Sequence, residues 1–183
     1  MNIRDYISYI FNKNKLKKIR LLISDIDGVM TDGRLIIDDN GIESKFFHTQ
    51  DGTGIIMALK SEIKISVISG SSSSSIKARF DKFRKYGFED LILGKENKMP
   101  SVLTLIEKYG LNKEEIAYIG DDLIDLKVMR YAGISFAPKD AHYEALKTAD
   151  IIINKKGGHG AFRAAVDMIL KSKGIYSEVI KRF

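Results

Sequence analysis

The chain has 183 residues, of which 44% are hydrophobic and 30% are charged. This composition excludes a wholly disordered or fibrous protein, and the length fits one domain, 1–183. Cysteine is absent, which excludes disulfides, thiolate catalysis and cysteine-ligated zinc, and the three histidines are scattered. No apolar run approaches the roughly 18 residues of a membrane span, and no signal peptide is recognisable. We therefore expect a cytoplasmic protein without a membrane span.

The net charge of +6 lies at the two ends of the chain. Residues 1–20 carry six basic side chains against one acidic one, and residues 171–183 carry four against one. The body between them is slightly acidic. A nucleic-acid groove needs its positive charge on the folded body, so we expect no nucleic-acid partner.

The first predicted element is a leading helix, followed by a basic segment that ends near residue 19. Its apolar side chains recur at helical spacing and share one face; they are Ile3, Tyr6, Ile7, Ile10 and Phe11. We expect this face to pack on the domain. A helix lying on a membrane surface is the alternative.

After residue 20, short apolar runs alternate with helical patterns. The predicted strands are 21–23, 65–68, 91–93, 116–119, 134–137 and 151–153. The predicted helices are 51–60, 76–86, 97–109, 123–131, 143–148 and 161–173, and residues 174–183 are a C-terminal tail. Residues 34–47 form a hairpin that turns at Asn40-Gly41. This order predicts an α/β fold of three layers, with a mainly parallel sheet between helices.

Polar residues follow three of these strands at their carboxyl ends, where open α/β sheets bind ligands. They are Asp25 with Asp27, Ser69 with Gly70, and Asp121 with Asp122 and Asp125; Lys98 precedes the last group. Carboxylates held close together repel one another unless a cation neutralises them, and oxygen ligands suit Mg²⁺. A hydroxyl, free amides and a lysine can hold phosphate oxygens. The set therefore predicts a Mg²⁺-dependent phosphoryl-transfer site.

In chain order, DIDGVMTD, ISG, a lone lysine and GDDLID resemble the four motifs of the haloacid dehalogenase (HAD) superfamily of phosphohydrolases. The resemblance extends from residue 20 to 173. Within it, DGVMTDGRL, QDGTGI, AYIGDDLIDLKVM and GGHGAFR are similar to the small phosphatases that act on 3-deoxy-D-manno-octulosonate 8-phosphate (KDO 8-phosphate). It implies a Rossmann-like HAD fold and an Mg²⁺ enzyme of lipopolysaccharide biosynthesis.

The resemblance also implies a role for each motif residue. Asp25 is the nucleophile that forms an aspartyl phosphate, and Asp27 is the general acid and base. The Mg²⁺ ligands are Asp25, Asp27 (through its carbonyl) and Asp121, while Asp122 and Asp125 orient these ligands. Ser69, Gly70 and Lys98 bind the phosphate oxygens.

The spacing of the motifs leaves no room for a cap domain. Residues 28–68 hold a hairpin, one helix and one strand, and residues 71–97 hold one helix and one strand. Since a phosphate site needs water excluded, we expect a neighbouring subunit to cover the site. The resemblance implies a homotetramer in which the hairpin packs against its copies and a C-terminal segment covers an adjoining site.

Several positions depart from the family pattern. Ser71 and Ile56 stand where the octulosonate phosphatases usually carry arginine, and His159 replaces another arginine. The family stretch Asn-Val-Arg-Asp-Gly reads His48-Thr49-Gln50-Asp51-Gly52, while Arg79 matches a substrate-binding arginine. We predict substrate contacts from residues 48–52 and Arg79, and no catalytic role for His159.

Three alternatives remain open. Ser71 and Ile56 favour a phosphatase for nonulosonate 9-phosphates of the KDN or sialic-acid type. A non-catalytic partner of an acylneuraminate cytidylyltransferase is the second alternative, although the intact motif residues argue against it. The third is a polynucleotide phosphatase that uses the basic ends, which predicts a steep salt dependence of binding.

Overall fold

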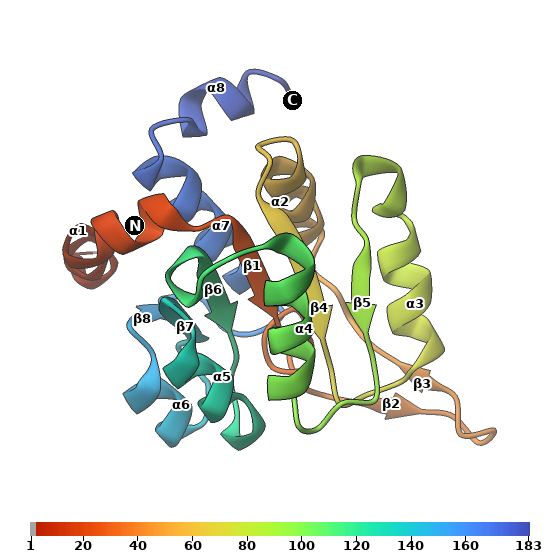
Figure 1. Cartoon of the computed structure of the whole chain (residues 1–183). Coiled ribbons are helices and arrows are strands. Elements are labelled where there is room, and N and C mark those ends of the chain that lie inside the picture. Colours follow the sequence, from red (N-terminus) through yellow and green to blue (C-terminus); the bar gives the residue numbers. More distant parts are fainter. Residues whose placement is uncertain (1–2) are drawn as a thin grey trace.

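A six-stranded parallel sheet forms the centre of the protein (Figure 1), in a computed structural model that describes residues 3–183. Its strands run in the order β5-β4-β1-β6-β7-β8. Their bounds are β1 Leu21–Ser24, β4 Lys64–Ile68, β5 Asp90–Ile92, β6 Ile116–Ile119, β7 Ile134–Pro138 and β8 Ile151–Ile153. β1 lies between β4 and β6, with Leu22 level with Ile65 and Ala117. All six predicted strands are confirmed to within two residues.

Helices cover both faces of this sheet. They are α1 Ile3–Lys18, α2 Thr49–Leu59, α3 Ser74–Asp81, α4 Met99–Tyr109, α5 Leu126–Tyr131, α6 Tyr143–Thr148, α7 Ala161–Ser172 and α8 Tyr176–Ile180. The helix predicted over 76–86 is divided, because α3 ends at Asp81 and a 3₁₀ turn follows at Arg84–Tyr86. Likewise, a 3₁₀ turn at Leu123–Asp125 precedes α5.

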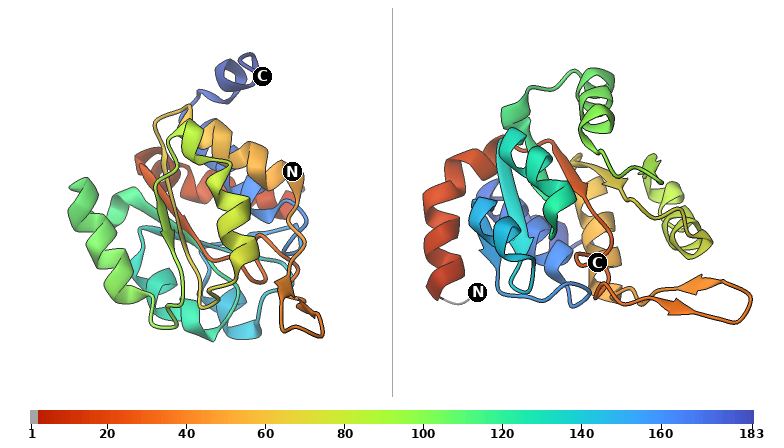
Figure 2. Two further views of the ribbon diagram at one scale, coloured as in Figure 1. Left: turned by 90° about the vertical axis from the view of Figure 1, so that its right-hand side faces the viewer. Right: turned by 90° about the horizontal axis from the view of Figure 1, so that it is seen from below.

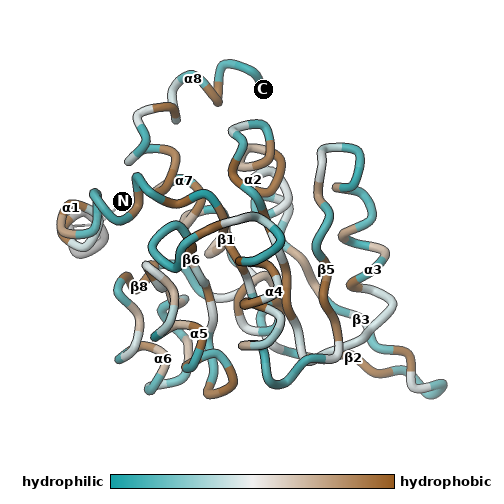
Figure 3. Tube along the Cα trace, in the orientation of Figure 1, coloured by the Kyte–Doolittle hydropathy of each residue, from teal (hydrophilic) through white to brown (hydrophobic). Residues whose placement is uncertain are grey.

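The apolar core is divided by the sheet into two clusters. One joins the sheet to α1, α2, α3 and α7, with Phe80 and Phe162 buried in it. The other joins it to α4, α5 and α6, around Tyr118 and Val102. Figure 3 shows the apolar stretches of the central strands between these layers. The predicted three-layer α/β fold with a parallel sheet is confirmed.

The predicted hairpin follows β1 and is shorter than expected. It pairs β2 (Ile36–Ile37) with β3 (Glu43–Ser44) in antiparallel register. Gly41 has φ +75°, a conformation that glycine adopts without strain, and its amide donates to the carbonyl of Asp38. The hairpin projects beyond the sheet and its helices (Figure 2, right). Its apolar side chains are exposed, among them Leu35, Ile37 and Phe46.

The leading helix is confirmed, but the face expected to pack on the domain is wrong. Ile7, Ile10 and Phe11 are exposed, whereas Tyr9 and Leu16 are buried. The helix packs against α7 and β8, and Tyr9, two turns before Leu16, lies on the side that faces them. The side chains of Ile3 and Tyr6, also assigned to this face, lie outside the described ones.

The C-terminal segment, expected as a tail, contains a helix. Val179 of α8 is buried against the core, and Lys60 Nζ lies 4.5 Å from the ring centroid of Phe183. In this subunit α8 lies at the opposite end of the sheet from the hairpin (Figure 1). Among the helices of residues 3–183, none combines the length and apolarity needed to cross a membrane.

Candidate active site

The three groups of polar side chains predicted to follow β1, β4 and β6 lie together at the carboxyl edge of the sheet. Asp25 comes directly after β1, and its amide donates to the carbonyl of Ile119 at the end of β6. Ser69 follows β4, and Asp121 lies two residues past the end of β6. Parallel strands place their carboxyl ends at one edge, which is why residues about 100 positions apart meet here.

Lys98 lies at the centre of this site as a buried cation between two carboxylates. Its Nζ lies 2.8 Å from Asp25 Oδ1 and 2.7 Å from Asp125 Oδ1. Lys98 and Asp125 are almost fully buried, and Asp25 is 4% exposed. Burial by itself would lower the pKa of Lys98, but the two carboxylates raise it above its usual value. The lysine is therefore charged at neutral pH and fixes one oxygen of the predicted nucleophile.

Asp125 organises the loop that carries Asp121. Its Oδ2 accepts hydrogen bonds from the amides of Asp121 and Asp122, at 2.9 and 3.2 Å. Its Oδ1 accepts from Lys98 and from the hydroxyl of Tyr118, a buried residue of β6. Asp122 is exposed and caps the following 3₁₀ turn through the amide of Leu123. Asp125 therefore holds the loop of Asp121 through two amides, and Asp122 caps the turn that follows.

Asp121 has a buried carboxylate oxygen, Oδ1, without a hydrogen-bond partner. Acceptor oxygens of Asp121, Asp25 and Asp125 lie within 4.8 Å of one another. Gly28 closes this cluster from the other side; a Cβ on it would lie 1.9 Å from Asp121 Oδ2, so no larger residue fits. A buried oxygen without a donor, among other carboxylates, fits a hard cation such as Mg²⁺.

The pKa values of the two carboxyls support the same conclusion. Burial, with the nearby charge of Asp125, raises the pKa of Asp25 to about 7 against the pull of Lys98. Burial and the charges of Asp25 and Asp125 raise the pKa of Asp121 to about 8. Without a cation these groups therefore hold protons near neutral pH, and a bound divalent cation would displace them.

Ser69 and Gly70 lie at the end of β4, where a phosphate could bind. The hydroxyl oxygen of Ser69 accepts from the amide of Ser71 at 3.0 Å, which leaves its proton free to donate. The α-carbon of Gly70 faces open space, since a Cβ there would meet nothing within 4 Å. The serine run then caps α3, because Ser73 Oγ accepts from the amide of Ser75.

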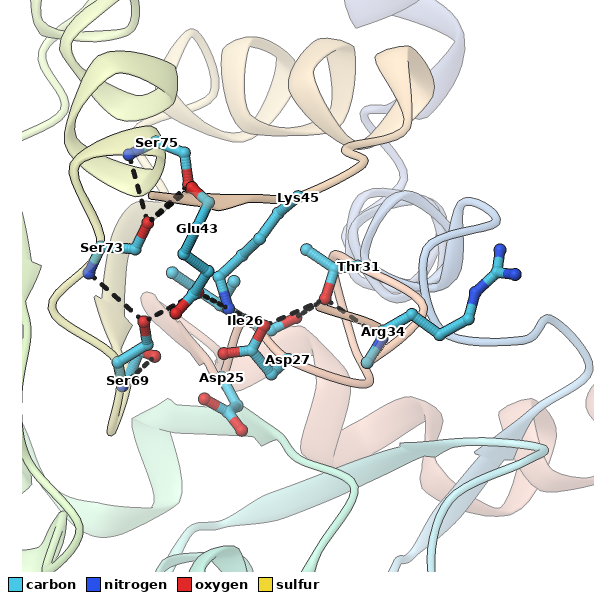
Figure 4. Close-up of polar contacts among 12 residues, drawn as sticks. Asp25, Ile26, Asp27, Thr31, Arg34, Glu43, Lys45, Ser69, Ser73 and Ser75 are labelled. Atoms are coloured by element: carbon cyan, nitrogen blue, oxygen red, sulfur yellow. Dashed lines mark hydrogen bonds and ion pairs between the residues drawn. The ribbon is translucent and has the colours of Figure 1, made fainter. Parts of the chain in front are cut away.

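Asp27 lies beside this loop and makes all its described side-chain contacts through one oxygen. Oδ1 accepts from Lys45 Nζ at 2.6 Å and from the hydroxyl of Thr31 at 3.2 Å. Lys45 also lies 2.7 Å from Glu43 Oε1. Figure 4 shows Lys45 and Glu43 reaching down from the hairpin to Asp27, above Asp25. The second oxygen of Asp27, Oδ2, accepts no hydrogen bond from the described residues.

Residues 48–52 and Arg79, predicted to contact substrate, do not form one group: His48 and Gln50 line a cavity, while Gly52 contacts Arg79 elsewhere. His48 and Gln50 lie at the start of α2 with Thr49, which is exposed, and His48 Nδ1 caps that helix through the amide of Gln50. Asp51 is buried, and its Oδ1 accepts from the amide of Arg163 in α7 at 2.8 Å. Asp51 therefore joins α2 to α7 through this hydrogen bond.

Arg79 is half-buried and packs between α2 and α3, where it lines a surface pocket. Its guanidinium carbon lies 4.9 Å from the centroid of Phe83, and its Nη2 is so close to Gly52 that a Cβ there would lie 2.4 Å away. Ile56 lines the same shallow pocket as Arg79. Gly52 and Arg79 therefore form the contact between α2 and α3.

His48 and Gln50 instead line a basic cavity of about 510 Å³. Its other lining residues are Lys139, Asn154, Lys155, Lys156 and His159, from the loops after β7 and β8. The loop after β8 also touches the loop after β1, because a Cβ on Gly157, next to the lining residue Lys156, would lie 1.9 Å from the carbonyl oxygen of Gly28. Cationic and amide side chains without an acidic neighbour in the lining suit an anionic ligand.

Sequence reasoning missed Lys45, Glu43, Tyr118 and the lysines of this cavity. Glu43 and Lys45 are two residues apart, on the same side of an extended segment, but nothing local shows which groups they meet. The cavity lysines come from the two loops after β7 and β8, and their proximity to the start of α2 depends on the sheet order.

The fold and the site define a class of protein. Residues 7–164 match the family model of the haloacid dehalogenase-like hydrolases, and the chain belongs to this family. Within it, the chain belongs with the 3-deoxy-D-manno-octulosonate 8-phosphate phosphatases: it is 39% identical to KdsC of Escherichia coli K12 over 164 residues, 90% of this chain and 86% of that protein.

Two solved structures extend this similarity to three dimensions. The 3-deoxy-D-manno-octulosonate 8-phosphate phosphatase of Moraxella catarrhalis, in complex with a magnesium ion, a phosphate ion and KDO, superposes with a TM-score of 0.88 at 34% identity, over 93% of this chain and 97% of that one. The cobalt-bound enzyme of Haemophilus influenzae gives 0.83 at 39% identity, over 89% and 94%. The predicted family resemblance is confirmed.

Proposed function

We propose that this protein is a Mg²⁺-dependent phosphatase that hydrolyses KDO 8-phosphate to KDO and phosphate. The observation that carries the proposal is the buried pairing of Asp25 with Lys98, next to the unpartnered oxygen of Asp121. This arrangement supplies a nucleophile, a cation for the phosphoryl oxygens and a place for a metal. Similarity to phosphatases of this name, over most of the chain, supports the substrate.

The chemistry follows from the two catalytic aspartates. Asp25 attacks phosphorus, the bond from phosphorus to the sugar oxygen breaks, and Asp27 gives that oxygen a proton. Asp27 then takes a proton from water as the water oxygen attacks phosphorus, and the bond from Asp25 to phosphorus breaks. Lys98, the Ser69 hydroxyl and the Gly70 amide stabilise the charge on the phosphoryl oxygens.

Asp25, Asp121 and the carbonyl of Asp27 would hold Mg²⁺, which when bound neutralises phosphate charge close to the nucleophile. Asp125 keeps Asp121 in place through the two loop amides. Because Asp125 already accepts from Lys98, Tyr118 and both amides, it acts on the metal through its neighbours.

The basic cavity is our candidate for binding the sugar acid beyond its phosphate. A carboxylate at the far end of the substrate would meet the lysines of the cavity beside His48 and Gln50. Ser71 and Ile56, where relatives carry arginine, favour a nonulosonate 9-phosphate as the second candidate. In this structure Ser71 bonds Glu43 of the hairpin, and Ile56 lies by Arg79.

We also propose a homotetramer built through the hairpin. The hairpin extends beyond the rest of the subunit (Figure 2). Its exposed apolar side chains are Leu35, Ile36, Ile37, Ile42 and Phe46. A patch of this kind marks an interaction surface, and within residues 3–183 no cap domain covers the site. Because α8 lies at the far end of its own subunit, any cover from the C-terminal segment would come from a neighbour. We place this one-domain enzyme in the cytoplasm, in lipopolysaccharide biosynthesis.

Phosphate release from a substrate panel tests the proposal. The panel contains KDO 8-phosphate, a nonulosonate 9-phosphate and a simple sugar phosphate, each assayed with Mg²⁺ and with EDTA, and Asp25→Asn is the blank. We expect Mg²⁺-dependent turnover, with the highest kcat/KM for KDO 8-phosphate. Turnover of none would end the enzyme proposal, and preference for the 9-phosphate would replace the substrate.

A further inference from the structure

The β-hairpin contributes a buried lysine to the catalytic site that belongs to none of the phosphatase motifs. Lys45 follows β3, and its side chain is 1% exposed. Its Nζ lies 2.6 Å from Asp27 Oδ1 and 2.7 Å from Glu43 Oε1. A lysine side chain has four rotatable bonds and is seldom buried without a charged partner. The two carboxylates therefore determine where its ammonium group lies.

Glu43 is itself held on the other side of the site. Its Oε1 accepts from the hydroxyl of Ser71 at 3.3 Å, and its carbonyl accepts from the hydroxyl of Ser73 at 3.4 Å. These serines directly follow Ser69 and Gly70, the predicted phosphate contacts. One chain of polar contacts therefore runs from the phosphate loop through Glu43 and Lys45 to Asp27 (Figure 4).

The contacts divide the two oxygens of Asp27 between separate tasks. Oδ1 accepts from both Lys45 and Thr31, whereas no described residue donates to Oδ2. The Asp27 side chain is 32% exposed, in contrast to the buried lysine. Rotation about the last carboxyl torsion is otherwise loosely restricted. Two donors on Oδ1 hold the carboxyl in one orientation and leave Oδ2 for the substrate and water.

We propose that Lys45, held by Glu43, is a positioning residue that orients the acid/base carboxyl of Asp27 for proton transfer. This inference rests on the proposed phosphatase function and on the role of Asp27 in it. Because both residues come from the hairpin, the element that carries the proposed subunit contact also sets the geometry of the catalytic carboxyl. Correct assembly of the hairpin is then a condition for full activity.

Lys45→Met tests the inference, since it keeps much of the side-chain volume and removes the ammonium group. Proton donation matters most when the leaving oxygen is a poor leaving group, as in a sugar phosphate, and least for an aryl phosphate with an acidic phenol. We expect kcat/KM to fall ten- to a hundredfold for the sugar phosphate and less than threefold for the aryl phosphate. Lys45→Arg should restore part of the loss, and Glu43→Gln should show the same pattern more weakly.

A double-mutant cycle with Asp27→Asn identifies the route of the effect. If Lys45 acts through Asp27, adding Lys45→Met to Asp27→Asn costs less than a further threefold. The matched control is Lys113→Met, which should match wild type. Lys113 is exposed and precedes β6, at the end of that strand away from the site. Far-UV circular dichroism and the urea midpoint establish that each variant is folded.

The outcomes separate this inference from the function beneath it. Inactive wild type on both substrates would end the proposed function. Active wild type with an equal loss on both substrates in Lys45→Met, or additive losses in the cycle, would overturn the positioning role. A raised KM with unchanged kcat would also overturn it, because Lys45 would then bind substrate directly.

Discussion

Lys98 Nζ lies 2.8 Å from Asp25 Oδ1, in a part of the site closed to solvent. The same ammonium group also bonds Asp125, so one cation pairs with carboxylates that follow two different strands. Removing one partner from a buried pair leaves the other charge uncompensated. The contact therefore contributes to both folding and catalysis.

Lys98→Met should reduce both the stability and the turnover, and each loss is measured separately. We expect the free energy of unfolding at pH 8 to fall by about 3 kcal/mol, as measured by urea denaturation of the metal-free protein. Turnover should fall at least a hundredfold, since a donor to the phosphoryl oxygens is lost. Lys113→Met should leave both unchanged. A Lys98→Met protein as stable as wild type would show that the pair is not structurally required.

Mg²⁺ should stabilise the protein more strongly at pH 8 than at pH 6. The raised pKa values, about 7 for Asp25 and about 8 for Asp121, mean that the metal-free folded protein retains these protons at pH 6. A cation must displace them, so its affinity rises with pH. Thermal unfolding with Mg²⁺ and with EDTA measures the shift in Tm. Asp121→Asn should abolish most of it, and a shift independent of pH would contradict the assignment.

Asp51 should make the protein less stable as pH rises from about 4 to 6. Burial raises its pKa to about 6 in the folded state, from an ordinary value of 3.8. Between about pH 4 and 6 the folded protein therefore keeps a proton on Asp51 that the unfolded chain has lost. Raising the pH through this interval favours unfolding, until Asp51 is ionised in both states. Two pKa units correspond to about 3 kcal/mol.

Asp51→Asn isolates this effect. The difference in unfolding free energy between wild type and Asp51→Asn should shift by about 3 kcal/mol in favour of the variant between pH 4 and pH 7. Urea denaturation at several pH values measures it. Parallel curves for the two proteins would mean that Asp51 ionises normally in the folded state.

Ile37→Glu in the hairpin should dissociate the proposed tetramer. Ile37 is 64% exposed in the subunit, and a carboxylate buried between copies would cost several kcal/mol. Sedimentation should give a mass well above 20.6 kDa for wild type and a smaller species for the variant. Leu103→Glu, on the exposed side of α4, is the control. If wild type is a monomer at micromolar concentration, no neighbouring subunit covers the site and the proposed tetramer is wrong.

Lys155→Met and Lys156→Met should weaken recognition of the sugar acid without impairing the chemistry. Both lysines line the basic cavity and neither belongs to the predicted phosphate site. We expect KM for KDO 8-phosphate to rise about tenfold in the double variant, with kcat little changed. For a simple sugar phosphate without a carboxylate, KM should not change. Equal effects on both substrates would place the carboxylate elsewhere.

The sequence by itself determined the class of fold and predicted which residues meet at the site. Alternating apolar runs fixed where strands form, because buried parallel strands are apolar throughout and polar residues stop them. Asp25, Ser69 and Asp121 each directly follow such a run or lie two residues past it. The carboxyl edge of a parallel sheet is a single place, so strand position alone brought these residues together.

Only the tertiary structure decided what surrounds these residues. Whether Arg79 faces substrate or the α2–α3 contact depends on how two helices pack, and Lys45 reaches Asp27 through the angle of a hairpin whose own strands are two residues long. The inward side of α1 was likewise set by its packing against α7 and β8. Such contacts join segments distant in sequence and leave no periodic pattern. Local chemistry thus predicted the catalytic groups, while packing selected the residues that hold and surround them.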